Sequence, residues 1–178
     1  VGYPKLTVQE RLAALPVLDA GTCCALPSLA AEPKSVRLTS IGGAPRFVVE
    51  PKRGEPQVYD AHTGARITSI TEAAALRAAG VYLGGAPLAY VGRIEEDAWT
   101  HSNALDAHRP LHVMQGEDPA RTRVYVSGST GEVVRDATLT ERGWNWVGAW
   151  IHWLYPFRGG ALDFAWADIV IWSSVAGT

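Results

Sequence analysis

Apolar and polar residues alternate through two blocks of the chain, separated by a helical stretch. The first block predicts strands at residues 35–41, 46–50, 57–60 and 66–68. The second block predicts strands at residues 87–94, 111–115, 122–126 and 132–135. Successive side chains of a strand point to opposite faces, so this period of two is typical of half-buried strands in antiparallel sheets.

A predicted helix precedes each block of strands. Residues 7–15 have a helical pattern, with Thr7 and Glu10 at capping-box spacing and Pro16 after the last residue. Residues 71–80 consist mostly of strong helix formers, and Gly80 is expected to end that helix. The order helix, strands, helix, strands predicts an α+β fold in which each sheet buries one face under its own helix.

The two blocks also resemble each other in sequence. Val58-Tyr59, followed by Thr63-Gly64, matches Val124-Tyr125, followed by Thr130-Gly131, with one extra residue before the second Thr-Gly. Each copy predicts a strand, a tight turn and a return strand. Two such copies with a helix between them indicate an internal repeat.

The last third of the chain has a different pattern. Six of the seven tryptophans lie between Trp144 and Trp172, and residues 161–178 are almost entirely apolar. Tryptophan is enriched where a membrane meets water, because its ring is apolar and its N–H stays hydrated. We therefore expect an interfacial aromatic helix at 137–158 and the start of a truncated transmembrane helix at 161–178. Placing the Asp163 and Asp168 carboxylates in the hydrocarbon core of a bilayer would cost free energy. These two residues therefore favour the alternative, a buried helix in a soluble protein.

Composition narrows the classes of function. The chain has 178 residues, of which 47% are hydrophobic and 19% charged, a composition typical of a globular protein. Its net charge of -2 argues against nucleic acid as a partner. Cys23 and Cys24 are adjacent and give no disulfide framework; two small buried residues are favoured over a redox or metal role. The chain begins at Val1 without an initiator methionine, which favours a piece of a longer protein.

Three segments resemble the PepSY-associated transmembrane family. They are the stretch DPARTRVYV at 118–126, STGEVV at 129–134 and WNWVGAWIHWLY at 144–155. The chain departs from the family pattern at Ser127, where an Asp is usual. The resemblance implies two PepSY-like repeats, at 1–68 and 69–136, on a bacterial inner-membrane protein whose repeats face the periplasm.

The family also implies a role. Some members are tied to iron uptake and to reduction of siderophore-bound iron by haem, while others are named only for a domain first proposed to inhibit peptidases. Within the aromatic stretch, Asn145, Gly148 and His152 fall on one helical stripe, and an imidazole is a usual axial ligand of haem iron. We expect these three residues to contact haem in the full-length protein and no cofactor in the piece alone. The alternative is a histidine that bonds to lipid headgroups.

No catalytic residue and no metal site are predicted. His101, His108 and His112 lie among acidic residues, but their spacing matches no recognised metal site and Pro110 breaks the helical register, so a solvated acidic loop is favoured. No hydrolase motif or phosphate-binding glycine loop is present in the sequence.

Three hypotheses of function follow. In the first, the chain is the periplasmic region of an inner-membrane protein that is accessory to iron–siderophore uptake, with a lipid bilayer and a ferric siderophore as partners. In the second, it is a non-catalytic binding or regulatory module that docks a periplasmic protein through its sheet edges. In the third, it is a soluble two-repeat protein whose tail packs as core.

Overall fold

The computed structural model describes residues 29, 32–152 and 163–176. The predicted helix at 7–15, Cys23 and Cys24 lie outside these residues. The chain divides into two compact units with the boundary after Leu139. We call the described residues up to Leu139 the head and those from Thr140 onward the tail, and we describe each by itself.

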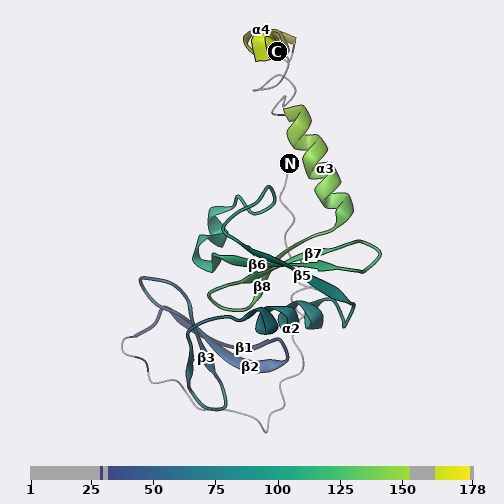
Figure 1. Ribbon diagram of the computed structural model, residues 1–178. Helices are drawn as coiled ribbons and strands as arrows, with labels where there is room; N and C mark the ends of the chain where they lie inside the picture. The colour runs from purple at the N-terminus through teal and green to yellow at the C-terminus, as the bar shows by residue number, and fades with distance from the viewer. Residues whose placement is uncertain (1–28, 30–31, 153–162, 177–178) are drawn as a thin grey trace. The chain divides into compact units, whose positions relative to one another are not determined.

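The head contains two four-stranded antiparallel sheets, each with its strands in chain order (Figure 1). The first sheet consists of β1 (Ser35–Ile41), β2 (Ala44–Glu50), β3 (Gln57–Asp60) and β4 (Arg66–Ile67). The second consists of β5 (Leu88–Ile94), β6 (Leu111–Gly116), β7 (Arg123–Ser127) and β8 (Val133–Ala137). The α+β class and all eight predicted strands are therefore confirmed.

Helix α2 (Glu72–Tyr82) lies between the two sheets in the sequence. The Thr71 hydroxyl caps its first turn by accepting a hydrogen bond from the backbone N–H of Ala74 at 3.2 Å. The prediction that Gly80 ends the helix is wrong, because the helix continues to Tyr82, whose ring packs against the core. The turn beyond it uses Gly84 and Gly85, with φ of +64° and +82°.

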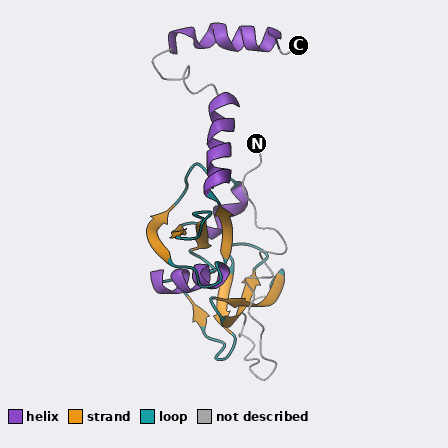
Figure 2. Cartoon of the chain, turned by 90° about the vertical axis from the view of Figure 1, so that its right-hand side faces the viewer, coloured by secondary structure: helices purple, strands orange, loops and turns teal. Residues whose placement is uncertain are grey.

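The α2 helix covers one face of the second sheet, and Figure 2 shows it among the strands of the head. Its buried face is made of alanines, which let the helix approach the sheet closely. Ala75 and Ala79 are fully buried there against Met114, Val124 and Val126. Removing these side chains from water is the main stabilising term of this layer.

A chain segment covers the opposite face of the same sheet. Between β5 and β6, in the stretch predicted to be irregular, lies a 3₁₀ helix, η2 (Asn103–His108), which is capped by Ser102. Leu105 of η2 packs against Leu111, Val113 and Tyr125. The second sheet is thus buried on both faces.

The first sheet has two unlike faces. One carries an apolar cluster of Phe47, Val49, Tyr59 and Ala61, with Leu29 against it. On the other face, the alternation of β1 and β2 places Arg37, Thr39, Val48 and Glu50. The second face is mostly polar, and it forms part of the candidate site described below.

The two Thr-Gly turns are built alike. The backbone N–H of Gly64 donates to the carbonyl of Asp60 at 2.8 Å, and that of Gly131 donates to the carbonyl of Ser127 at 2.9 Å. Ser127 is therefore the counterpart of Asp60, and both turns have the same length. The second repeat therefore has no extra residue before its Thr-Gly; its additional residue follows the turn, in β8, because Val126 pairs with Val133 but Tyr125 pairs with Arg135.

This equivalence corrects the sequence alignment of the repeats. Tyr59 corresponds to Val126, and not to Tyr125 as residue identity suggests. Tyr59 lies in the apolar cluster of the first sheet, and Val126 lies on the α2-covered face of the second. Tyr125 lies on the opposite face, with Leu105.

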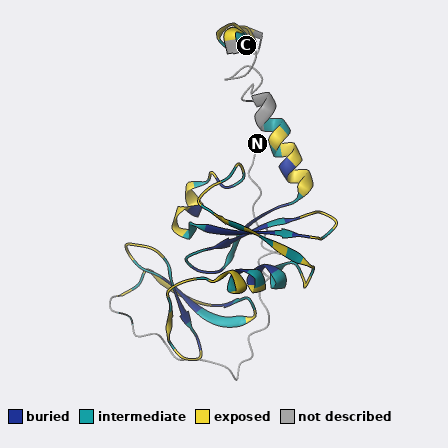
Figure 3. Cartoon of the chain, in the orientation of Figure 1, coloured by how far each residue is buried: buried dark blue, intermediate teal, exposed yellow. Residues whose placement is uncertain are grey.

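The tail contains α3 (Leu139–His152), the 3₁₀ helix η3 (Asp163–Ala165) and α4 (Trp166–Ala176). Large apolar side chains are exposed on both α-helices: Trp144 is 71% exposed, Trp146 60% and Trp172 70% (Figure 3). Among the described residues, no helix combines the length and apolar character needed to cross a membrane.

Candidate functional site

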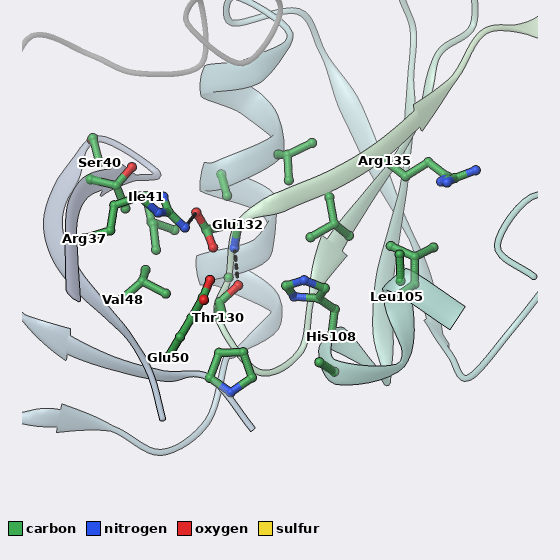
Figure 4. Close-up of a pocket in the computed structure, with 18 of the residues that line it drawn as sticks. Arg37, Ser40, Ile41, Val48, Glu50, Leu105, His108, Thr130, Glu132 and Arg135 are labelled. Atoms are coloured by element: carbon green, nitrogen blue, oxygen red, sulfur yellow. Dashed lines mark hydrogen bonds and ion pairs between the residues drawn. The ribbon is translucent and has the colours of Figure 1, made fainter. Parts of the chain in front are cut away.

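A groove of about 880 Å³ lies in the head between the first sheet and the second half of the head (Figure 4). Its volume falls within the range of small-molecule and peptide sites. The floor is the mostly polar face of the first sheet, with Arg37, Thr39, Val48 and Glu50. The wall is formed by η2, the β7–β8 turn and β8.

Two glycines let the turns beside the groove lie close to their neighbours. Gly42 approaches α2 so closely that a Cβ there would lie 3.2 Å from the backbone nitrogen of Ala78, and its φ is +59°. Gly131, with φ of +75°, similarly leaves room for Ile41 and Ile70. Only glycine adopts these conformations without strain, so both turns fit tightly against their neighbours.

An ion pair crosses the groove. The Arg37 guanidinium donates to the Glu132 carboxylate at 2.8 Å, joining β1 to the turn before β8. Lys34 lies 4.0 Å from Glu50 on the floor. Arg37, Lys34 and Glu50 are largely exposed to water, so these pairs contribute little stability and can exchange partners readily.

His108 is a half-buried titratable group of the wall. Its Nδ1 lies 3.0 Å from the Ser127 hydroxyl, which accepts a hydrogen bond from the backbone N–H of Thr130 at 2.9 Å. Burial lowers the pKa of His108; the nearby Glu132 and Glu50 carboxylates oppose this shift, and Arg37 adds to it. His108 is therefore a neutral imidazole at pH 7 and presents a polar, uncharged edge to the groove.

Ser40 adds a second polar group. The residue borders the groove and is only 7% exposed. Its hydroxyl oxygen is buried and has no hydrogen-bond partner among the described residues, which costs free energy. Because that oxygen is inaccessible, the groove as it stands does not offer it to a ligand.

The histidines of the acidic stretch do not come together. His112 is buried in β6, where its Nδ1 lies 2.9 Å from the Tyr90 hydroxyl, and burial lowers its pKa, with Arg93 acting in the same direction. His101 is exposed beside Glu96. Within the described part of the chain, no group of three or more His, Cys, Asp or Glu is placed to hold a metal ion.

The predicted haem-contacting residues all lie in α3. Asn145, Gly148 and His152 follow one another at intervals of three and four residues of this helix, which keeps them on one side of it. The surroundings of the His152 side chain lie outside the described residues. Haem contact at this stripe therefore stays a prediction.

The groove itself was not predicted from the sequence. Its residues come from β1, β2, η2 and the β7–β8 turn, which no local pattern connects. One signal was available: the repeats differ in the connection between their first two strands, which is Gly42-Gly43 in the first repeat and residues 95–110 in the second.

Comparison with protein families, with curated proteins and with solved structures finds no match for this chain. The groove offers hydrogen-bond donors and acceptors, an imidazole and small apolar surfaces. The described head does not bring together a nucleophile, a base and an accessible reaction centre, because Ser127 beside His108 is fully buried.

Proposed function

We propose that the tail binds a lipid bilayer and that the head is a PepSY-like module held at that surface. The observation that carries this proposal is the exposure of large apolar side chains on α3, η3 and α4, where Phe164 of η3 is 85% exposed and Trp172 of α4 70%. An apolar surface of this kind is unfavourable in water and marks a membrane or protein contact. Tryptophan favours the first, because it partitions to the membrane boundary.

The distribution of charge in α4 agrees with this proposal. Asp168, in its first turn, is its only charged residue, and Ile171, Trp172 and Val175 are exposed beyond it. The hydroxyls of Ser173 and Ser174 both donate to the carbonyl of Val170, at 3.1 and 2.7 Å. Their polar groups are thus satisfied within the helix, as an apolar environment requires.

Repetition within the head supports the PepSY likeness. The two turns share their hydrogen bonds, and the apolar face with Phe47, Val49 and Tyr59 corresponds to the α2-covered face of the second sheet. That the head faces the periplasm at a bacterial inner membrane is part of the proposal and rests on the sequence resemblance. A role accessory to iron–siderophore uptake, with a ferric siderophore or a periplasmic protein as partner, rests on the sequence resemblance.

Flotation with phospholipid vesicles tests the bilayer proposal. The full chain, mixed with vesicles of phosphatidylethanolamine and phosphatidylglycerol, should rise with them in a density gradient. Replacing Trp144, Trp146 and Trp172 together by serine should reduce the floated fraction, since about 1–3 kcal/mol of apolar transfer is lost per large side chain. The matched control is Val91→Ser, which removes an exposed apolar side chain from the head.

Two results would contradict the bilayer proposal. One is a wild-type chain that stays at the bottom of the gradient with the vesicles present. The other is a triple serine variant that floats as well as the wild type and the Val91→Ser control.

A second candidate function is haem binding in the full-length protein, favoured by the spacing of Asn145, Gly148 and His152 on α3. The His152 imidazole would supply an axial ligand, and Gly148, which lacks a side chain, would leave room beside it. Bound haem would supply one-electron reduction of ferric iron.

The haem prediction is tested by absorption. The full-length protein purified from membranes should show a Soret band that is lost in His152→Ala and retained in His101→Ala, which changes an exposed histidine of the head. A full-length protein without a Soret band, or a band unchanged in His152→Ala, would exclude His152 as the ligand.

A further inference from the structure

The two sheets of the head differ in how their outer strands are protected. β4 has only two residues, and the pairing of β5 with β6 shifts between Tyr90 and Gly92, which indicates a bulge. Residues 135–137 of β8 are engaged in further interactions. β1 pairs with β2 along all seven of its residues without a shift. Among the described outer strands, β1 therefore has the long, regular edge to which another strand adds most readily.

The backbone groups of Val36 and Leu38 point out of this edge. In an antiparallel pair, successive residues alternate between bonding to the neighbouring strand and pointing away from it. The N–H of Ala61 donates to the carbonyl of Pro45 at 3.2 Å, so Pro45 and every second residue after it in β2 are directed at β3. Their partners in β1, Ser40, Leu38 and Val36, are hence directed away from β2. Within the described part of the chain, no hydrogen bond at this edge occupies Val36 or Leu38.

The same two residues expose apolar side chains. Val36 is 44% exposed and Leu38 38%. They pair with Val49 and Phe47, which belong to the buried apolar cluster of the first sheet, so this apolar layer continues to the edge of β1 and meets water there. A strand that paired with Val36 and Leu38 would place its own side chains on the same face and extend the layer.

The charges beside the edge indicate which kind of strand fits it. The Lys34 and Arg37 side chains are more exposed than the carboxylates that they contact, those of Glu50 and Glu132. A second copy of the chain would bring the same two cations to the edge, and like charges across a strand pair are destabilising. The exposed part of β1 is also short, residues 35–38, whereas a standard protein interface has roughly 20–30 residues a side. Both points favour a short acidic segment over a dimer.

We propose that the outer edge of β1 binds an extended acidic segment of another protein, which adds a fifth strand to the four-stranded first sheet. The segment runs antiparallel to β1, as all the described strand pairs of the head do. Its residues opposite Val36 and Leu38 are apolar and bond to their backbone groups, and the residue between them, opposite Arg37, is Asp or Glu. This inference goes beyond the bilayer and haem proposals and depends on neither.

Fluorescence anisotropy with designed peptides tests the proposal. The probe is fluorescein-labelled Thr-Val-Glu-Val-Glu-Thr, titrated with the full chain in micelles of an uncharged detergent. We expect saturable binding, with Kd at least about tenfold lower than for the matched peptide Thr-Val-Lys-Val-Lys-Thr. The proposal is overturned if the glutamate peptide shows no saturable binding up to about 1 mM, or if the lysine peptide binds as tightly.

Backbone pairing is tested with two methylated forms of the glutamate peptide. In the proposed pairing, the valine N–H groups face β1 and the glutamate N–H groups face away from it. Methylating both valine nitrogens should raise Kd at least about tenfold, and methylating both glutamate nitrogens should leave it within about threefold. Equal effects of the two patterns would show that the peptide does not pair with the strand edge, and would overturn the proposal.

Val36→Pro changes the edge on the chain itself. Because the Val36 N–H points away from β2, proline removes an outer donor and leaves the β1–β2 bonds in place. Kd for the glutamate peptide should rise at least about tenfold, whereas Val36→Thr, which keeps the N–H and a β-branched side chain, should stay within about threefold. Circular dichroism verifies that both variants are folded.

Two results with these variants would overturn the proposal. One is a folded Val36→Pro variant that binds the glutamate peptide as tightly as the wild type. The other comes from light scattering without peptide: a wild-type dimer that Val36→Pro converts to a monomer would assign the edge to a second copy of the chain.

Discussion

Ser127 takes the place in the second repeat that Asp60 takes in the first. The Asp60 carboxylate accepts hydrogen bonds from the backbone of His62 and Thr63, each at 3.0 Å, and pairs with Arg46 at 2.5 Å. Burial alone would raise the pKa of Asp60, but these bonds and Arg46 outweigh it and hold the pKa below its usual value. The shorter, neutral Ser127 side chain instead contacts His108, so an ion pair in one turn is replaced by an imidazole contact in the other.

The half-buried imidazole of His108 predicts a dependence of stability on pH. Its pKa in the folded chain lies below the ordinary value of 6.5, so the unfolded chain binds a proton more readily than the folded chain. The free energy of unfolding should therefore fall as pH drops below about 6.5, where the unfolded state gains protons first. Urea unfolding of the full chain at pH 7.5, 6.5 and about 5.5, followed by circular dichroism, measures the change.

His108→Gln separates this effect from other titrations. Glutamine keeps a polar side chain but does not titrate, so the loss of stability below pH 6.5 should become smaller. A remainder is expected from His112, whose pKa is also lowered by burial. A pH dependence that is identical in His108→Gln and the wild type would show that His108 does not stay neutral in the fold.

The packing of α2 on the second sheet forms the largest buried apolar cluster among the described residues of the head. Met114 is fully buried between the helix and β7, so Met114→Ala should lower the free energy of unfolding by about 2–5 kcal/mol. Val91→Ala, at a 56% exposed position of β5, should change it by less than about 0.5 kcal/mol. If Met114→Ala and Val91→Ala lowered the free energy of unfolding equally, the packing of α2 on the second sheet would not be a main source of the head's stability.

Strands were predictable from local sequence, as in residues 35–41, whose alternation predicts a strand and which form β1 unchanged. The end of α2 could not be predicted from the sequence. The helix continues past Gly80 because the Tyr82 side chain packs against the core, and this packing outweighs the low helix propensity of glycine. The alignment of the repeats also failed at Tyr59 and Tyr125, since matching by residue identity put an extra residue before the second Thr-Gly, whereas the two turns have the same length. Local patterns thus determine elements, while packing determines where they end and how they correspond.

At the scale of the whole chain, the groove arises from a difference between two similar halves. The second repeat supplies η2 to cover one face of its sheet, and the first has only a two-residue turn at that place. No single stretch encodes the groove, so it becomes visible only when β1, η2 and β8 are brought together. The tail, by contrast, was apparent from its tryptophans alone, and the exposure of Trp144 and Trp172 agrees with the bilayer proposal.

Quenching by brominated lipid tests the bilayer proposal most directly. Trp99 is the only tryptophan of the head, so Trp99→Phe leaves fluorescence from the tail alone. With vesicles whose acyl chains carry bromine, the emission of this variant should shift to the blue and lose most of its intensity, because the tail tryptophans would lie within reach of the acyl chains. Emission that stays unshifted and unquenched by brominated lipid, while aqueous iodide still quenches it, would contradict the account.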